Sequence, residues 1–354
     1  MSEIALLGDI AFTGIISSEP GENLTRFSKI TPIIKNPELL VFANLEVPVR
    51  EGDERNKYKS IIHYSDPEAT EDLLRQFNIG CVSLANNHIF DCGISGLKAT
   101  VALLDKLNIA HTGAGWLYVH CEPVIIEKKN VRYGFLAYVD RSTNPRTENF
   151  QEIQINYFNI EKAKREIVSL KKNVDKVICS IHWGVDYSFY PTSDQVKKAR
   201  QLVDAGADII MGHHTHTFQP FEMYKGSYIF YSLGSLTFGD YIREGKTKLQ
   251  ALFRKTKKSA IVKIDFNENK LKFIPTKELK GNFIVFDKRN YKKWSSRKWI
   301  HYNIKNLSPL LNSLYTINEK LFYRIFEYFF GYYKNPVRRL FEFSNLKKIK
   351  KLFL

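Results

Sequence analysis

The chain has 354 residues, 44% of them hydrophobic and 14% aromatic, which provides ample apolar surface to bury a core. It contains no run of about 18 apolar residues, so no membrane-spanning helix is predicted. The N-terminus lacks the basic region of a secretory signal, and its apolar stretch stops at Gly8. We therefore expect a cytoplasmic protein or one bound to the periphery of a membrane.

The net charge of +16 is unevenly distributed along the chain. Residues 1–240 contain 25 Lys and Arg against 29 Asp and Glu, whereas residues 241–354 contain 28 against 8. The first part is slightly acidic and the second strongly basic, so they are interpreted separately. We expect a domain over residues 1–240, which could continue to about residue 280. A basic, aromatic-rich extension over residues 281–354 follows it.

Short apolar runs alternate with amphipathic segments through the first 240 residues. The runs predict β-strands at Ile4–Leu7, Leu39–Ala43, Cys81–Leu84, Val177–Ile181 and Ile209–Met211. Apolar residues at helical spacing predict helices at Pro67–Phe77, Ser95–Leu107, Glu161–Leu170 and Ser193–Ala205. Strands that alternate with helices favour a mostly parallel sheet with helices on its faces.

Two pairs of adjacent strand-like runs predict antiparallel hairpins. The first pair is Val119–Ile126 with Val131–Val139, and the second is Phe218–Tyr224 with Ser227–Leu233. Hairpins beside a parallel core favour a sandwich of sheets over one doubly wound sheet. Later in the chain, residues 250–265 and 270–277 are strand-like, and residues from 306 onward have a helical, basic pattern.

Polar clusters follow most of the predicted strands, at the position where ligand sites form in open α/β sheets. Together they supply carboxylates, imidazoles and amides, which are ligands for a divalent transition metal such as Mn, Fe or Zn. Any one cluster alone would be interpreted as a turn, a cap or a buried histidine. The clusters are Gly8-Asp9, Asn44-Leu45-Glu46, Asn86-Asn87-His88 with Asp91 and Gly93, His182-Trp183-Gly184, and Gly212-His213-His214-Thr215-His216.

The last cluster places three histidines within four positions, at His213, His214 and His216. In an extended segment, side chains two positions apart lie on the same side, so His214 and His216 are expected to face one ion. The alternative is a polar loop that holds no ligand. We favour the metal site because the other clusters supply matching ligands.

As a set, these clusters and the Tyr231-Ser232-Leu233-Gly234 segment resemble the CapA/PgsA family, whose members serve in bacterial capsule and poly-γ-glutamate synthesis. The resemblance covers residues 3–240. That family is similar to the calcineurin-like metallophosphoesterases. The resemblance therefore implies an α/β fold, a two-sheet sandwich flanked by helices, with one or two divalent metal ions at the strand ends.

The resemblance also implies roles for the matching residues. Catalytic roles fall to His88, which would face the substrate, and to Asp91, which would orient His88. Asn44 and His213 are assigned to substrate binding, although His213 could instead point into the sheet. Six residues would be metal ligands: Asp9, Glu46, Asn87, His182, His214 and His216.

Arg141 follows a predicted strand and is a further candidate for binding an anionic substrate, although a solvent-exposed arginine is the simpler interpretation. Two positions depart from the family patterns. Metallophosphoesterases usually have a histidine two positions after the first aspartate, and here that position is Ala11, so one ligand of the first metal is missing. The CapA motif usually ends Leu-Gly-Asn, and here Ser235 replaces the asparagine.

These features predict a surface-polymer biosynthesis protein with a metal-dependent, phosphoesterase-like hydrolase site. A bound ion would activate water for attack on a phosphoester or an amide, and His88 would donate a proton to the leaving group. The alternative is a non-catalytic assembly or export factor that uses the same fold to bind an acidic polymer or a synthase. In either case the expected partner is an anionic polymer or a phosphorylated substrate.

The basic extension carries apolar residues on one helical face, among them Leu321, Phe322, Ile325, Phe326 and Phe329. Such a segment suits the surface of an anionic membrane, so peripheral contact there is one expectation. A terminal helix packed on the domain is the alternative. Nucleic acid is a less favoured partner, because no nucleic-acid-binding module accompanies the charge.

Overall fold

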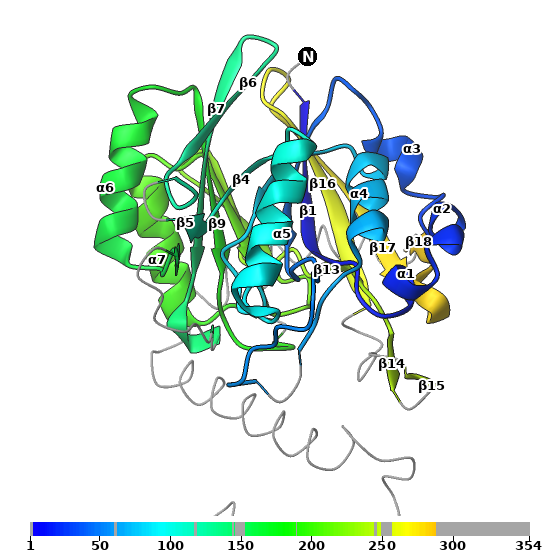
Figure 1. The fold of residues 1–354 in the computed structure, drawn as a ribbon. Helices are drawn as coiled ribbons and strands as arrows, with labels where there is room; N and C mark the ends of the chain where they lie inside the picture. The colour runs from blue at the N-terminus through cyan, green and yellow to red at the C-terminus, as the bar shows by residue number, and fades with distance from the viewer. Residues whose placement is uncertain are drawn as a thin grey trace, which may run out of the picture. The chain divides into compact units, whose positions relative to one another are not determined.

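Figure 1 shows the computed structural model of the chain, which describes residues 3–59, 62–116, 119–143, 145, 153–188, 190–243, 246–248 and 257–287. The basic segment that begins at residue 306 lies outside the described residues, as do residues 250–256. The helical pattern and the membrane contact expected of the extension therefore stay predictions. No helix among the described residues combines the length and the apolarity needed to cross a membrane.

The larger of the two main sheets has eight strands. They are β1 (Glu3–Ala11), β2 (Leu40–Leu45), β3 (Ile79–Ser83), β4 (Ala110–Thr112), β13 (Ser235–Phe238), β16 (Lys258–Asp265), β17 (Lys270–Glu278) and β18 (Ile284–Phe286). The order is β18-β17-β16-β1-β2-β3-β4, and β13 also pairs with β1. The pairs β1–β2, β2–β3, β3–β4 and β1–β13 are parallel, so the carboxyl ends of these strands meet at one edge.

The second main sheet has six strands. They are β6 (Val124–Lys128), β7 (Val131–Val139), β9 (Lys176–His182), β10 (Ile209–His213), β11 (Phe221–Tyr224) and β12 (Ser227–Phe230). Their order is β11-β12-β10-β9-β7-β6, with parallel pairs between β7, β9, β10 and β12. Two small two-stranded sheets pair β5 (Ala114–Trp116) with β8 (Ile153–Ile155) and β14 (Tyr241–Arg243) with β15 (Lys246–Lys248).

Four longer helices flank the sheets: α4 (Pro67–Gln76), α5 (Gly93–Lys106), α6 (Ile160–Lys171) and α7 (Ser193–Asp204). Side chains cap three of them, because Asp66, Asn159 and Thr192 each accept a hydrogen bond from a backbone N–H of the first turn. The short helices are α1 (Ile15–Ser18), α2 (Asn23–Arg26) and α3 (Thr31–Ile34), with 3-10 turns η1 (Pro20–Glu22), η2 (Arg141–Thr143) and η3 (Lys280–Asn282).

The sheets pack face to face, and alternate residues of β7 serve two different layers of the core. Phe135 stacks on Phe42 of β2 with ring centroids 5.4 Å apart, which joins the two sheets. Leu136 and Tyr138 point the other way and share a buried cluster with residues of α6 and α7. Figure 1 shows α6 and α7 beside the smaller sheet and α4 and α5 beside the larger one. The sandwich is thus covered by helices on both sides.

Both expected hairpins form, and their turns explain why they are tight. Lys129 and Asn130 join β6 to β7, and both have positive φ values, of 53° and 61°. Lys225 and Gly226 join β11 to β12 with φ values of 50° and 85°. Two consecutive left-handed residues are typical of the turn that matches the twist of paired strands.

Two motif glycines permit backbone segments to approach more closely than any side chain would allow. A Cβ on Gly8 would lie 1.9 Å from the carbonyl oxygen of Gly234, whose segment leads into β13. A Cβ on Gly212 would lie 2.0 Å from the carbonyl oxygen of Tyr231. The glycines next to Asp9 and His213 therefore bring the segment that starts at Tyr231 against the strand ends.

Each of the five expected strands and four expected helices is present, with ends shifted by a few residues. The α/β two-sheet sandwich flanked by helices is thereby confirmed. The strand β13 was not foreseen, because its sequence Ser-Leu-Thr-Phe is too short for a periodic signal. The larger sheet continues past residue 240 through β16, β17 and β18, while the domain boundary itself stays a prediction.

The aromatic pair between the sheets yields a test of the fold. We expect Phe42→Ala to lower the free energy of unfolding by about 3–5 kcal/mol, because a fully buried ring is replaced by a cavity. Ile125→Ala on β6, where the side chain is 46% exposed, serves as a control and should change it by less than about 0.5 kcal/mol. Urea denaturation measures both, and equal effects would contradict the packing described.

Candidate metal centre

The polar clusters expected at the strand ends converge because the strands are parallel and in register. Asp9 of β1 lies opposite Asn44 of β2, and Asn44 lies opposite Ser83 of β3. In the second sheet, His213 of β10 lies opposite His182 of β9. Each motif therefore begins at the same level of its sheet, and the loops that follow meet there.

Asp9, Glu46 and His216 form the first group of candidate ligands. One ligand atom from each lies within 4.8 Å of the others. Nδ1 of His216 is 3.8 Å from Oδ2 of Asp9, and its Nε2 is 3.8 Å from Oε1 of Glu46. Both separations exceed a hydrogen bond, and one ion would bind only one of the two ring nitrogens. Two ligands about 2.1 Å from one tetrahedral ion are about 3.4 Å apart and no more than about 4.2 Å in any geometry.

A second group shares Glu46 and adds Asn87, His182 and His214. Nε2 of His182 lies 2.9 Å from Oδ1 of Asn87, 3.1 Å from Nδ1 of His214 and 3.8 Å from Oε1 of Glu46. An amide oxygen, a second imidazole nitrogen and a carboxylate oxygen thus lie within 3.8 Å of Nε2 of His182. The structure brings together all six residues that the sequence nominated as ligands.

The backbone geometry expected for the histidine segment is wrong. His214 and His216 are not in an extended strand, because their φ values are 87° and 53° and β10 ends at His213. The backbone turns through left-handed conformations, which are costly for non-glycine residues. The two rings lie near each other, with centroids 6.3 Å apart, but they do not share one position as expected, because His216 lies beside Asp9 and His214 beside His182.

Glu46 provides the test of whether these residues fit a metal ion. Its side chain is fully buried, and neither carboxylate oxygen has a hydrogen-bond partner within the part of the chain that the structure describes. A buried carboxylate without a partner is costly unless a cation compensates it. Its neighbours at 3.8 Å are imidazole nitrogens, which are good ligands for Mn, Fe and Zn. The residues therefore fit a divalent ion.

The two carboxylates differ in their electrostatics. Burial raises the pKa of Asp9, but the hydrogen bond and charge of His213 and the charge of His216 outweigh it, so the pKa is lowered. Burial and the charge of Asp9 raise the pKa of Glu46 well above its usual value. Burial also lowers the pKa of His216 to about 4 and that of His182 well below its usual value. Both rings are thus neutral at pH 7, as metal ligands must be.

Two hydrogen bonds and one close contact with an imidazole hold Asp9 in place. Oδ1 accepts a bond from Nδ2 of Asn44 at 2.9 Å and lies 2.9 Å from Nδ1 of His213, while Oδ2 accepts one from the backbone N–H of His214 at 3.2 Å. Asn44 and His213 are both fully buried. The structure therefore places these two residues, nominated for substrate binding, behind the carboxylate of Asp9.

Arg141, also nominated for substrate binding, lies apart from this network. It is exposed, and its guanidinium stacks over the ring of Tyr157 at 3.7 Å. Stacking on an aromatic ring fixes the guanidinium without neutralising it. Its role toward a substrate stays a prediction.

The position of the missing histidine is filled by apolar side chains. Ala11 is fully buried in a small cluster with Val47 and Phe238. The ring of Phe238 lies edge-on against His216, with centroids 5.4 Å apart. Nδ1 of His216 also lies 2.8 Å from the hydroxyl of Ser235. Apolar side chains thus stand where metallophosphoesterases usually have a histidine ligand. The group around Asp9 therefore has one candidate ligand fewer than the group around His182.

His88 and Asp91 form a hydrogen-bonded pair beside the ligands. Nδ1 of His88 lies 2.7 Å from Oδ2 of Asp91, and the carboxylate is fully buried. Burial and the charge of Lys59 lower the pKa of His88, although Asp91 opposes them. The neutral ring donates its Nδ1 proton to Asp91, which leaves Nε2 to interact with a bound molecule.

Two residues of this pair's surroundings were missed by the sequence analysis. Nζ of Lys59 lies 2.6 Å from Oδ1 of Asp91 and also donates to the carbonyl oxygen of Asn87. The backbone N–H of His63 donates to Oδ2 of Asp91, and its ring lies 4.9 Å from that of His88. Both come from the long segment between β2 and α4, which carries no strand or helix pattern to suggest its path. The only signal in the sequence was the positive charge of Lys59, which had been given no role and could have been matched to the carboxylate of Asp91.

Removing the charge of Glu46 should affect the metal-free and metal-bound proteins in opposite ways. At pH 7 and without metal, we expect Glu46→Gln to raise the free energy of unfolding by about 1 kcal/mol, because burial disfavours the charged carboxylate. With Mn²⁺ the order should reverse, since a ligand is lost. Acidification protonates Glu46 and should erase the metal-free difference. Thermal unfolding of both forms measures this, and Glu51→Gln, which changes an exposed carboxylate, is the control. A more stable metal-free wild type would contradict the prediction.

Replacing both His214 and His216 by alanine should abolish stoichiometric metal binding at this centre, because each ion would lose a nitrogen ligand. Elemental analysis after dialysis against Mn²⁺, Fe²⁺ or Zn²⁺ measures the effect, and circular dichroism checks that the variant folds. An unchanged metal content in the folded double variant would reject the ligand assignment.

Curated relatives of the chain include two from the genus Bacillus. The chain is 32% identical over 250 residues to the capsule biosynthesis protein CapA of Bacillus anthracis, which covers 69% of this chain and 58% of that protein. It is 31% identical over 245 residues to the PGA biosynthesis protein CapA of Bacillus subtilis, which covers 69% and 61%. The chain therefore matches about three fifths of the length of these relatives.

Solved structures with a related arrangement are more distant. A hypothetical protein from Thermus thermophilus aligns with a TM-score of 0.47 and 16% identity, covering 80% of this chain and 99% of that chain. A 5'-nucleotidase precursor from the same organism aligns with a TM-score of 0.44 and 16% identity, covering 77% and 54%. Both TM-scores are low, so the fold assignment rests on the strand pairings of the chain itself.

A match to a family of known sequences covers the region that holds the candidate centre. Residues 3–240 match the family described as bacterial capsule synthesis protein PGA_cap. This stretch includes every nominated ligand and about two thirds of the chain. The resemblance found in the motifs is confirmed, and the chain belongs to the bacterial capsule synthesis protein PGA_cap family.

Proposed function

We propose that the chain acts in the synthesis of a bacterial surface polymer of the capsule or poly-γ-glutamate type, as a hydrolase that depends on a divalent metal. Family membership supports the biological setting. The observation that supports hydrolysis is the carboxylate of Glu46, which has no hydrogen-bond partner among the described residues and lies 3.8 Å from nitrogens of His182 and His216. Burial of such a group is costly, so its presence favours a bound cation over a purely structural role.

The two groups of ligands differ in how completely they would hold an ion. Four side chains, Glu46, Asn87, His182 and His214, would hold one ion of Mn, Fe or Zn. Glu46 would be shared with a second position that Asp9 and His216 complete. A divalent ion bound here supplies Lewis acidity and lowers the pKa of water toward neutrality. The position around His182 has the fuller set of ligands and is the one on which the proposal depends.

His88 would move a proton at Nε2. Its Nδ1 is engaged by Asp91, and Asp91 is held in turn by Lys59, so the ring cannot rotate freely. The side chain of His88 remains 15% exposed, whereas that of Asp91 is fully buried. His88 is thus the member of the pair that a substrate can reach, and it would protonate the leaving group.

The proposed substrate is an anionic polymer or a phosphorylated molecule. The bond cleaved would be a phosphoester or an amide, since both place developing negative charge on oxygen where a cation stabilises it. The exposed guanidinium of Arg141 would contribute to binding an anion. Asn44 would act indirectly by positioning Asp9, and His213 would act the same way.

A non-catalytic assembly or export factor is the second candidate, and the surroundings of Ala11 favour it. The apolar cluster of Ala11, Val47 and Phe238 removes a ligand from the position that Asp9 and His216 share. A chain with an incomplete centre could retain the fold to bind an acidic polymer or a synthase. Turnover measurements separate the two candidates.

The His88–Asp91 pair provides the catalytic test. With Mn²⁺, Fe²⁺ or Zn²⁺ and an aryl phosphate, an aryl phosphodiester or poly-γ-glutamate, we expect His88→Ala to lower kcat by about 10²–10⁴-fold, because proton transfer is lost. Asp91→Asn should also lower kcat, since it weakens the hold on the ring. Both variants should retain the bound metal.

The control is Asp72→Asn, which changes an exposed carboxylate on α4 and should leave kcat unchanged. Product release measures turnover, and elemental analysis measures metal content. Equal turnover in His88→Ala and wild type would refute the role of His88. No turnover by the wild type with any metal or substrate would favour the assembly factor.

A further inference from the structure

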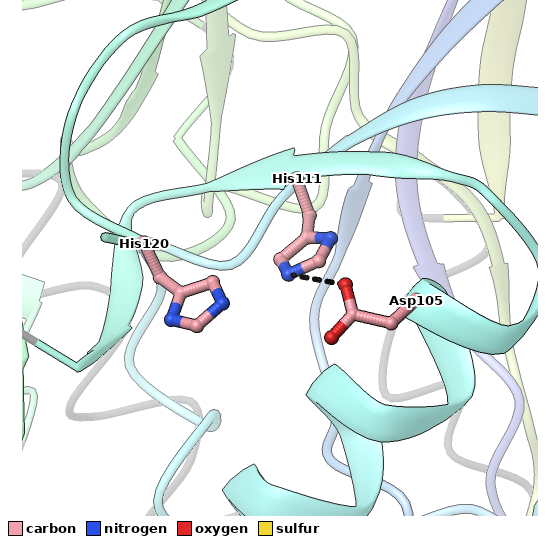
Figure 2. Close-up of side chains that lie close together, drawn as sticks. All are labelled: Asp105, His111 and His120. Carbon is pink, nitrogen blue, oxygen red and sulfur yellow. Dashed lines mark ion pairs between the residues drawn. The ribbon is translucent and has the colours of Figure 1, made fainter.

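A second group of metal-ligating side chains lies outside the centre described above. Asp105 belongs to the last turn of α5, His111 lies in β4, and His120 follows β5. Each offers one ligand atom, and the three atoms lie within 4.8 Å of one another. Figure 2 shows the two rings and the carboxylate pointing toward one another. The three residues belong to none of the polar clusters that supply the first centre.

The Nε2 atom of His111 has a free lone pair that could bind a metal ion. Its Nδ1 lies 3.0 Å from the carbonyl oxygen of Ile109, which can only accept, so Nδ1 carries the proton. The side chain is only 6% exposed, and its Nε2 is buried without a hydrogen-bond partner among the described residues. One ring nitrogen held by a backbone carbonyl and the other left free is the arrangement typical of histidines that bind metals.

The distances within the group suit an ion better than a hydrogen bond. Oδ1 of Asp105 lies 3.8 Å from Nε2 of His111, which is beyond hydrogen-bond range. Two ligands on one Zn²⁺ ion lie about 3.4 Å apart at the tetrahedral angle and no more than about 4.2 Å apart. The same 3.8 Å separates Glu46 from the imidazole nitrogens of the first centre. The pair thus leaves room for an ion between its atoms.

His120 completes the group from the opposite side. Its ring stacks on that of His111 at an interplanar angle of 12°, with centroids 5.2 Å apart. Nδ1 accepts a long hydrogen bond of 3.3 Å from the backbone N–H of Trp116, and the other nitrogen is directed toward His111 and Asp105 (Figure 2). For that nitrogen to bind an ion, the ring proton would move to Nδ1, so the long hydrogen bond from Trp116 would be lost and a metal–nitrogen bond gained.

We propose that Asp105, His111 and His120 form a separate binding site for a transition-metal ion of the Zn²⁺ class, with water in the remaining positions. Two imidazoles and one carboxylate are the ligands that such ions prefer. The three side chains come from a helix end, from the edge strand of the larger sheet and from the turn that leads toward β6. A bound ion would therefore tie that turn and the edge strand to α5.

Metal counting tests the site in the full-length protein. After the metal is stripped and the protein is dialysed against Zn²⁺, we expect Asp105→Asn combined with His120→Ala to bind one equivalent less than its parent, measured by elemental analysis. Asp204→Asn, which also changes an acidic residue at a helix end, is the matched control and should bind the same amount. Equal metal content in the double variant and its parent would overturn the proposal.

The same comparison in the His214→Ala/His216→Ala background separates this site from the first centre. There the remaining equivalent should disappear with His120→Ala, and its persistence would count against the site. If that background does not fold, the difference measured against the wild type decides.

Trp116 gives a local readout, because its ring lies 5.3 Å from that of His120. Co²⁺ bound at the site should quench its fluorescence in a saturable way. Both Trp116→Phe and His120→Ala should remove that component of the quenching. Full quenching retained in His120→Ala would show that the ion binds elsewhere and would reject the assignment.

Discussion

Two carboxylates, Asp9 and Glu46, are buried at the junction of the two sheets, and the rest of the centre is arranged around this constraint. Asp9 is stabilised by Asn44, by the backbone of His214 and by the nearby His213. Glu46 has no such hydrogen-bond partner among the residues that the structure describes. Because a buried charge without compensation opposes folding, a divalent ion would contribute to stability as well as to chemistry.

The fold makes this arrangement possible by placing rigid elements on every side of the two carboxylates. Asp9 comes from the central strand of the larger sheet, and His182 ends a central strand of the smaller one. The aromatic contact between Phe42 and Phe135 is part of the core that packs those sheets together. Ligands on strand ends are positioned more precisely than ligands on free loops, which suits a site that requires short metal–ligand distances.

The sequence was sufficient to predict those features of the fold that depend on hydrophobic periodicity and on the order of strands and helices along the chain. Apolar runs located the strands, and parallel strands imply that the clusters after them converge. The choice of Asp9, Glu46 and Asn87 as ligands within those clusters came from the resemblance to the family. The left-handed backbone at His214 could not be predicted, because nothing local demands a strained conformation there. Lys59 was missed for a different reason: its segment follows tertiary contacts instead of a repeating pattern. Asp105 and His120 lie in no motif, so only the folded chain reveals their proximity.

Residues of the short strand β13 contact His216 directly and reach the His88–Asp91 pair through His63. Its Ser235 contacts His216, and the ring of Phe238 packs against His216 on one side and against His63 on the other. His63 in turn lies against His88, so the ring of Phe238 connects His216 to the His88–Asp91 pair through His63. Changes in the free energy of unfolding caused by substitutions at His216 and at His88 should therefore not be additive. A double-mutant cycle that includes Phe238 would measure their coupling.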